Sequence, residues 1–298
     1  MNTRLMNRVM RWSCGMAIVL PLAALAAEDI DSTHEIPGDG LVQVENLAGS
    51  VAFTTWDRNE VQVRGKVGDD VEEVEIEATS NGIRIHVQNR KNRNRIDPTH
   101  LHLKVPEGAS IEAEGVSADF KVSGSKGDSI RLETVSGDVE ISAESHKVDI
   151  SSVSGDVEFE GVADRVTAES VSGDVTLVGM KNEVEASTVS GDVALEGGRI
   201  ESGRFETVSG ELNLMLELSD DGRLNCDSMS GDISLRLPAS QQASFSAQSF
   251  SGKITTEFGD PRLHSKSPSG SILKAQVGDN GARIRLETFS GDVSIRAR

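Results

Sequence analysis

The sequence has no tyrosine, and its 298 residues include only two tryptophans and eight phenylalanines. Sugar-binding clefts often use aromatic rings as platforms, so the residues that usually bind a glycan are scarce in this chain. Cysteine is equally rare, with Cys14 and Cys226 the only copies. Once the N-terminal segment discussed below is removed, no intramolecular disulfide can form. We expect Cys226 to be a small buried core residue, with an intermolecular bridge as the alternative.

Acidic residues outnumber basic ones: the chain has 48 Asp and Glu but 30 Lys and Arg, which gives a formal net charge of −18. A nucleic-acid partner would require a basic face, so this balance argues against one. It argues equally against simple adsorption to anionic lipid. The charge fits a soluble, self-repelling exported protein.

A long apolar run is absent except near the N-terminus, where residues 16–26 are apolar and follow Arg4, Arg8 and Arg11. This run is too short to span a bilayer, so we predict no transmembrane anchor. Small residues at Ala24 and Ala26 offer a cleavage site, and we predict that residues 1–26 are a secretory signal peptide. The mature chain would have a charge near −21, because the signal contains three arginines and no acid. We expect a periplasmic protein, with cell-surface association left open.

A five-residue motif recurs along the chain at a nearly constant spacing. Val-Ser-Gly-Asp-Val occupies 135–139, 153–157, 171–175 and 189–193, and related versions occupy 208–212, 229–233, 250–254, 268–272 and 289–293. A period of 18–21 residues between the glycines indicates stacked structural units, as in a solenoid.

Each unit reads as two short strands joined by the Ser-Gly-Asp corner. Between Lys147 and Ala163 the apolar residues alternate with polar ones, which is typical of half-buried strands. We assign the apolar residues of this segment to inward columns: Val148, Ile150, Val153, Val157, Phe159 and Val162. A sandwich would need two-residue hairpin turns, and no regular Asn-Gly or Asp-Gly turns occur. We therefore predict an all-β fold, a parallel β-helix solenoid, right-handed by the usual crossover preference.

The predicted organisation divides the chain into four parts. Residues 1–26 are the signal, 27–39 a polar segment, 40–115 an irregular β part that caps the stack, and 116–298 the regular repeats. The chain ends on a repeat with no capping helix, so we expect an open β edge that invites end-to-end self-association. Charged side chains near this edge can oppose such pairing: Arg283, Arg285, Arg296 and Arg298.

The corner residues are the candidate structural and metal sites. Glycine can adopt positive φ at a sharp corner, and we assign this structural role to Gly137, Gly155, Gly173, Gly191, Gly210, Gly231, Gly252 and Gly291. The aspartates that follow should stack in one column and could form a calcium ladder: Asp138, Asp156, Asp174 and Asp192. The alternative is turn chemistry, in which each carboxylate bonds a backbone amide and points to solvent. We predict no other cofactor.

Other candidate sites carry weaker signals. His100 and His102 flank Leu101 and should point outward from one strand, but no third metal ligand is evident. Trp56 begins a distinctive Trp-Asp-Arg corner, which we expect to cover the stack rather than form a site. No nucleophile elbow, P-loop or His-Glu-x-x-His motif is present, so we assign no catalytic residues.

The order of these features resembles the DUF4097 family, a group of bacterial exported β-strand-repeat proteins described as candidate adhesins. The features are the corner at 49–51, Thr55-Trp56-Asp57-Arg58, the segment 103–109 and the Ser-Gly-Asp series. The resemblance implies a right-handed β-helix in the bacterial envelope and no catalytic residues.

Three functions remain open. The first is a non-catalytic adhesin-like or scaffold protein of the cell envelope that binds an envelope component or a protein. The second is a polysaccharide lyase or hydrolase, since β-helices also support those activities, although such enzymes need a cleft with convergent groups. The third is a self-assembling structural element.

Overall fold

Strands account for every regular element in the computed structural model, which describes residues 29–90, 96–259, 264–267, 270–279 and 281–298. The prediction of an all-β fold is therefore confirmed. The predicted signal peptide, residues 1–26, lies outside the described residues. The N-terminal strands are β1 (Asp29–Glu35), β2 (Leu41–Trp56), β3 (Glu60–Lys66), β4 (Val71–Thr79), β5 (Gly82–Asn89) and β6 (Thr99–Pro106).

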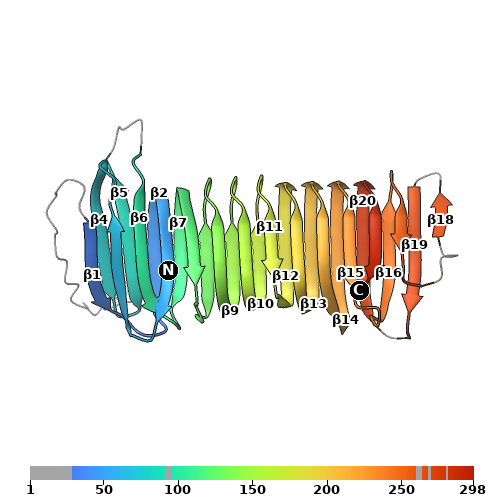
Figure 1. The fold of residues 1–298 in the computed structure, drawn as a ribbon, viewed down its shortest axis with the longest axis horizontal. Coiled ribbons are helices and arrows are strands. Elements are labelled where there is room, and N and C mark those ends of the chain that lie inside the picture. Colours follow the sequence, from blue (N-terminus) through green and yellow to red (C-terminus); the bar gives the residue numbers. More distant parts are fainter. Residues whose placement is uncertain (1–28, 91–95, 260–263, 268–269, 280) are drawn as a thin grey trace, which may run out of the picture.

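The remaining strands continue along a rod, with the N-terminal strands at one end and the C-terminal strands at the other (Figure 1). The central strands are β7 (Ser110–Ser123), β8 (Ser129–Glu133), β9 (Val139–Ser151), β10 (Val157–Glu169), β11 (Val175–Val178), β12 (Lys181–Ser190), β13 (Val193–Ser209), β14 (Leu212–Ser230) and β15 (Ile233–Leu237). The last are β16 (Ala243–Ser249), β17 (Ile254–Thr256), β18 (His264–Ser267), β19 (Gly270–Val277), β20 (Ala282–Ser290) and β21 (Val293–Ala297).

The central strands pair in parallel with a register equal to the repeat. Val157 of β10 lies opposite Val139 of β9 on one side and Val175 of β11 on the other, a step of 18 residues each way. Equivalent residues of successive repeats are therefore neighbours about 4.8 Å apart. The period of the sequence becomes the stacking period of the structure.

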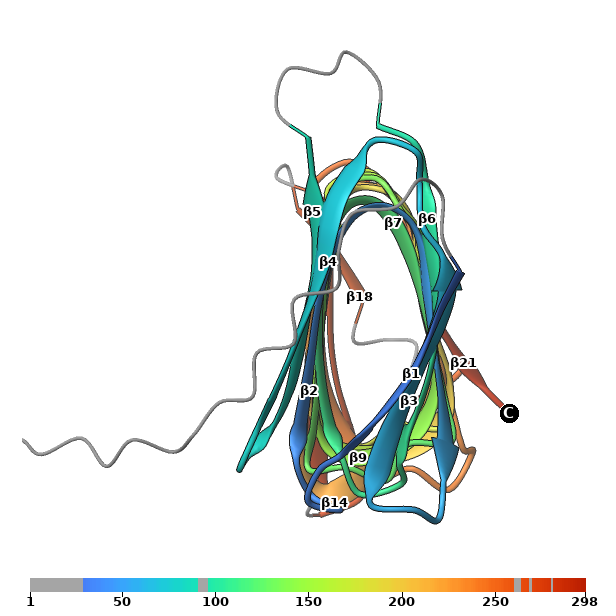
Figure 2. The same cartoon turned by 90° about the vertical axis from the view of Figure 1, so that its left-hand side faces the viewer.

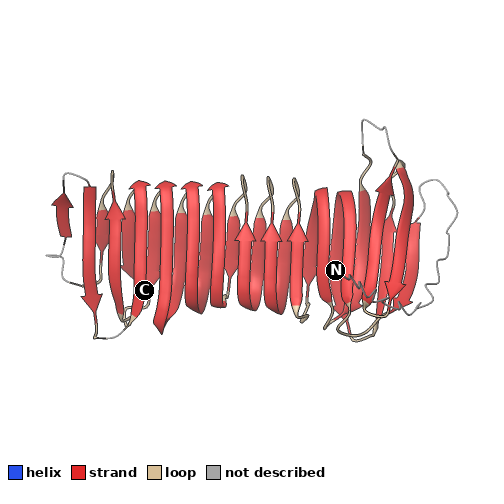
Figure 3. Ribbon diagram, turned by 180° about the vertical axis from the view of Figure 1, so that it is seen from behind, coloured by secondary structure: helices blue, strands red, loops and turns tan. Residues whose placement is uncertain are grey.

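Viewed along the rod, the strands enclose an elongated ring with two broad faces (Figure 2), and the opposite side of the molecule is likewise built of side-by-side strands (Figure 3). The inward side chains form columns inside this ring. One column contains Val139, Val157, Val175 and Val193, each at most 1% exposed. Burying each such side chain contributes about 1.5–3 kcal/mol, so the stack is stabilised along its whole length.

The N-terminal part, which the sequence predicts to be irregular, contains antiparallel strands. Here β1 and β6 pair antiparallel with β3, and β4 pairs antiparallel with β5. Parallel pairing begins where β5 and β6 meet β2. The outermost strands at this end are β1 and β4, and β4 carries a row of exposed acids: Glu72, Glu73, Glu75 and Glu77.

The prediction that the chain ends on an open edge is also wrong. Strand β20 pairs with β14 on one side and β16 on the other, and β21 lies between β15 and β17. The last repeat is thus inserted between two earlier ones. The segment that contains the predicted corner at 268–272 instead leads into β19, which pairs antiparallel with β16 and β18. Pro268 and Ser269 lie outside the described residues.

Candidate functional site: the corner column

A buried serine or threonine that was not predicted from the sequence stands two residues before the serine of each Ser-Gly-Asp corner. In one repeat Ser152 is 5% exposed, and its Oγ accepts the amide of Gly155 at 3.0 Å. In the next, Ser170 accepts the amide of Gly173 at the same distance. In other repeats a threonine at this position donates instead to a carbonyl of the neighbouring corner, as Thr188 does to Gly173. In these repeats the buried hydroxyl therefore fixes the corner internally, because a buried polar group needs a partner, whereas Ser228 Oγ has none.

The corner glycines are required for a reason other than the one predicted. None of the eight has positive φ. A Cβ on Gly155 would instead lie 1.9 Å from the carbonyl oxygen of Gly137, and one on Gly173 would lie 2.1 Å from that of Gly155. The close approach of successive coils excludes any side chain here.

The predicted aspartate column exists, and its carboxylates bond the coil that follows. Asp138 Oδ1 accepts the amide of Asp156 at 3.1 Å, and Asp156 Oδ1 accepts that of Asp174 at 2.9 Å. Asp174 in turn accepts the amide of Asp192 at 2.8 Å. One oxygen of each linked carboxylate is thus occupied by backbone, and within the described ranges no three His, Cys, Asp or Glu residues are grouped to hold a metal ion. Calcium binding stays a prediction.

The apolar residue of each corner points outward, contrary to the inward assignment of Val153. Val153 is 42% exposed, while the neighbouring Ser152 is buried. Successive corners are linked, since the amide of Ser172 donates to the carbonyl of Val153. We call the resulting column the apolar ridge; in spatial order it comprises Leu47, Val116, Val135, Val153, Val171, Val189, Val208, Met229, Phe289 and Phe250. Ten positions at the strand spacing extend about 40 Å.

Acidic residues flank the apolar ridge on both sides. In the sequence, each aspartate of the column stands three residues after a ridge residue. A second set of acids stands two residues before a ridge residue: Glu133, Glu169, Glu206, Asp227 and Glu287. Burial raises the pKa of Asp227, and the nearby Glu287 and Glu206 raise it further. The ridge is therefore an apolar strip with carboxylates on both sides, of which Glu206 pairs with Arg204 and Glu287 with Arg285.

Sequence comparison places the chain in a family. A family model described as Toastrack DUF4097 matches residues 37–196 and 160–296, which together cover most of the chain. The chain belongs to the Toastrack DUF4097 family. The two matched ranges both include corners of the repeat.

Solved structures similar to this Toastrack chain are distant from it. A candidate adhesin of Bacteroides fragilis shares 13% identity at a TM-score of 0.46, with 91% of this chain and 97% of that chain covered. A candidate adhesin of Parabacteroides distasonis shares 10% identity at a TM-score of 0.42, with 90% and 97% covered. No curated protein matches the sequence.

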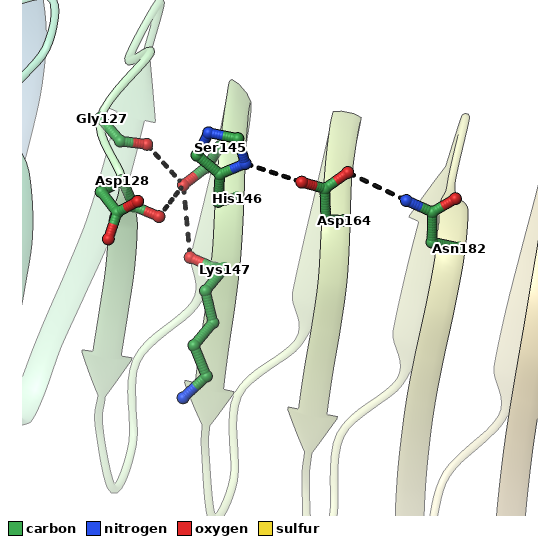
Figure 4. Close-up of polar contacts among 7 residues, drawn as sticks. All are labelled: Gly127, Asp128, Ser145, His146, Lys147, Asp164 and Asn182. Atoms are coloured by element: carbon green, nitrogen blue, oxygen red, sulfur yellow. Dashed lines mark hydrogen bonds and ion pairs between the residues drawn. The ribbon is translucent and has the colours of Figure 1, made fainter.

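The opposite edge of the Toastrack rod carries a second ladder, shown in Figure 4. His146 Nδ1 lies 2.7 Å from Asp164 Oδ2, and Asn182 Nδ2 donates to Asp164 Oδ1 at 2.9 Å. The hydrogen bond to Asp164 and its charge raise the pKa of His146. This ladder is exposed and links three successive coils.

The other sequence candidates do not form sites among the residues that the structure describes. His100 and His102 are exposed as predicted, but His100 bonds Ser50, and the two histidines lie opposite Lys66 and Arg64. Such cations disfavour a metal. Trp56 donates to the carbonyl of Glu60 and contacts Arg58 and Lys104 through its ring.

Cys226 is fully buried in β14, as predicted, and burial raises its pKa well above the ordinary value. No helix within the described ranges of this Toastrack chain is long and apolar enough to cross a membrane.

Proposed function

We propose that this protein is an exported, non-catalytic, adhesin-like binding protein of the bacterial cell envelope. Its stacked coils are proposed to form a right-handed parallel β-helix, which the 18-residue parallel register supports. Export is supported by the N-terminal sequence. The periplasm is the default compartment for such a chain, with the cell surface as the further possibility.

The apolar ridge is the observation that carries this proposal. Soluble monomers rarely expose continuous apolar patches of more than a few hundred Å², and larger ones usually mark interaction sites. The core is already complete beneath the ridge, because Ser152 and Ser170 bury their hydroxyls while Val153 and Val171 stay outside. Val153 and Val171 keep 42% and 43% of their surface exposed.

The flanking acids indicate which partner fits. A segment with aliphatic side chains in a row and basic side chains on both sides would match the ridge in shape and charge. We therefore propose a protein partner with this pattern. End-to-end self-assembly is less well supported, since the outermost strands β1 and β4 at the N-terminal end both carry exposed acids that oppose edge pairing.

Co-sedimentation with isolated cell envelopes tests the proposal. The ridge variant combines Val153→Ser, Val171→Ser and Val189→Ser. The control variant combines Glu158→Ser, Thr176→Ser and Ala194→Ser, which occupy one outward row in the same coils. We expect saturable pelleting of the wild type and the control, about tenfold weaker pelleting of the ridge variant, and loss after the envelopes are treated with protease.

Equal pelleting of the ridge variant and the wild type would overturn this function. Pelleting that survives protease treatment but is lost in the ridge variant would overturn the choice of a protein partner.

A further inference from the structure

A groove of about 950 Å³ lies on the outer face near the C-terminal end, away from the apolar ridge. Four strands build it, β14, β20, β16 and β19, in that order across the face. Its exposed side chains are cationic or hydrogen-bonding, in a protein whose net charge is −18. They are Arg223, Asn225, Ser244, Ser246, Lys274, Gln276, Arg283 and Arg285.

Strand register arranges these side chains in two rows across the groove. From β14 to β19, the first row runs across the strands in this order: Arg223, Arg283, Ser244 and Gln276. Two residues along each strand, the second row runs in the same order: Asn225, Arg285, Ser246 and Lys274. Side chains two residues apart share a face of a strand, so both rows point the same way.

Among the residues that the structure describes, three of the four cations of the groove have no acidic partner. In the described part of the chain, Arg285 pairs with Glu287 at 2.9 Å, whereas Arg223, Arg283 and Lys274 form no ion pair. Arg223 and Arg283 are also direct cross-strand neighbours, an arrangement of like charges that destabilises a sheet. An anion placed between them would remove this repulsion.

The floor of the groove offers no apolar anchor. Phe245, Ile284 and Ala275 line it but are only 3%, 2% and 6% exposed. A ligand seated here would meet the charged and hydrogen-bonding groups of the exposed side chains, together with the alkyl stems that carry them. That favours a molecule that is polar throughout, such as an acidic sugar chain, over a peptide with apolar side chains.

We propose that this groove binds an acidic polysaccharide, with its anionic groups on Arg223, Arg283, Arg285 and Lys274. Its hydroxyls would bond the serine, asparagine and glutamine side chains of the same rows. The proposal is independent of the ridge, because the two surfaces share no residue. A scarcity of aromatic platforms does not oppose it, since guanidinium forks recognise carboxylate, sulfate and phosphate groups by hydrogen bonding.

Titration calorimetry with purified polysaccharides tests this assignment. The probes are polygalacturonate, which is carboxylated, dextran sulfate, neutral dextran and poly-glutamate. We compare the wild type with the groove variant Arg223→Gln/Arg283→Gln. The control variant Arg236→Gln/Arg296→Gln removes another pair of cross-strand neighbours, on β15 and β21, with the same change in net charge.

We expect the wild type and the control to bind at least one anionic polysaccharide, more weakly as salt rises, and neutral dextran not at all. The groove variant should bind about tenfold more weakly at an equal or higher melting temperature, because it also removes the repulsion between Arg223 and Arg283. Preference for polygalacturonate over dextran sulfate, or the reverse, would identify the anionic group.

Equal losses in the two variants would overturn the assignment, because binding would then follow net charge alone. Equal or tighter binding of poly-glutamate would also overturn it, in favour of an acidic peptide. Neither result would bear on the ridge, whose test uses other variants and whole envelopes.

Discussion

The ring of Phe289 stacks on that of Phe250, with centroids 4.8 Å apart and planes inclined by 7°. Both rings belong to the apolar ridge, and Phe289 lies between Phe250 and Met229, although it follows both in the chain. The contact exists because the last repeat is inserted into the stack.

Engineered disulfides test the order of the coils. Ser230 lies opposite Ser290, which places their Cα atoms within reach of a disulfide, whereas Ser251 lies one coil further away. We expect Ser230→Cys/Ser290→Cys to form an intramolecular bridge on oxidation and Ser230→Cys/Ser251→Cys to remain reduced. Gel mobility without reductant and mass spectrometry measure the outcome. Bridging of the second pair alone would mean that the repeats stack in chain order.

Substitution of a corner glycine tests the close approach of coils. In Gly155→Ala the new Cβ would lie 1.9 Å from the Gly137 carbonyl oxygen, so backbone must shift. We expect the free energy of unfolding to fall by about 2 kcal/mol or more. Ser154→Ala, in the same exposed corner, is the control and should change it by less than about 0.5 kcal/mol. Equal effects in urea denaturation would contradict the role assigned to glycine.

The aspartate column can be tested with paired substitutions. Asp156→Asn keeps an oxygen to accept the amide of Asp174, whereas Asp156→Ala does not. We expect the alanine variant to lose about 0.5–1.5 kcal/mol of stability and the asparagine variant to lose less. Since no three His, Cys, Asp or Glu residues are grouped to hold a metal ion within the described ranges, a chelator should leave the melting temperature unchanged. A chelator-induced fall that Asp156→Asn abolishes would instead support the calcium ladder.

The ladder on the opposite edge predicts a pH dependence. Asp164 raises the pKa of His146, so the charged imidazole bonds Asp164 more strongly than the neutral one. Its stabilising effect is fully present below the ordinary pKa of 6.5 and is lost as the pH rises through the higher folded value. An NMR titration of His146 should show the raised pKa, and Asp164→Asn should return it toward the ordinary value. An identical titration curve in both proteins would rule out the pair.

Local pattern was enough to predict much of this protein. The recurring Ser-Gly-Asp corner fixed the period and the all-β class, because a parallel register of equivalent residues follows directly from a repeat. Cys226 was correctly placed in the core from its residue type. The resemblance to the Toastrack family also came from sequence order alone.

The inward assignment of Val153 failed because it followed residue type instead of position. Counting on by two residues from the buried Val148 and Ile150 reaches Ser152, which is buried, and leaves Val153 outside. The signal that could have shown this was present: a serine or threonine stands before the apolar residue of nearly every corner. The buried hydroxyl of Ser152 has a partner in the amide of Gly155, so a polar residue can hold the inward position.

The sequence by itself determined the repeat, the corner chemistry and the strand class, since each depends on residues close together in the chain. Only the tertiary structure decided which coils are neighbours at the C-terminal end. Arg223 and Arg283 share a groove because β20 pairs with β14 and β16, a choice between competing strand edges that have similar local patterns. Strand pairing across such separations depends on the fit of whole edges and on the closing strands at the end of the stack, and no local spacing encodes it.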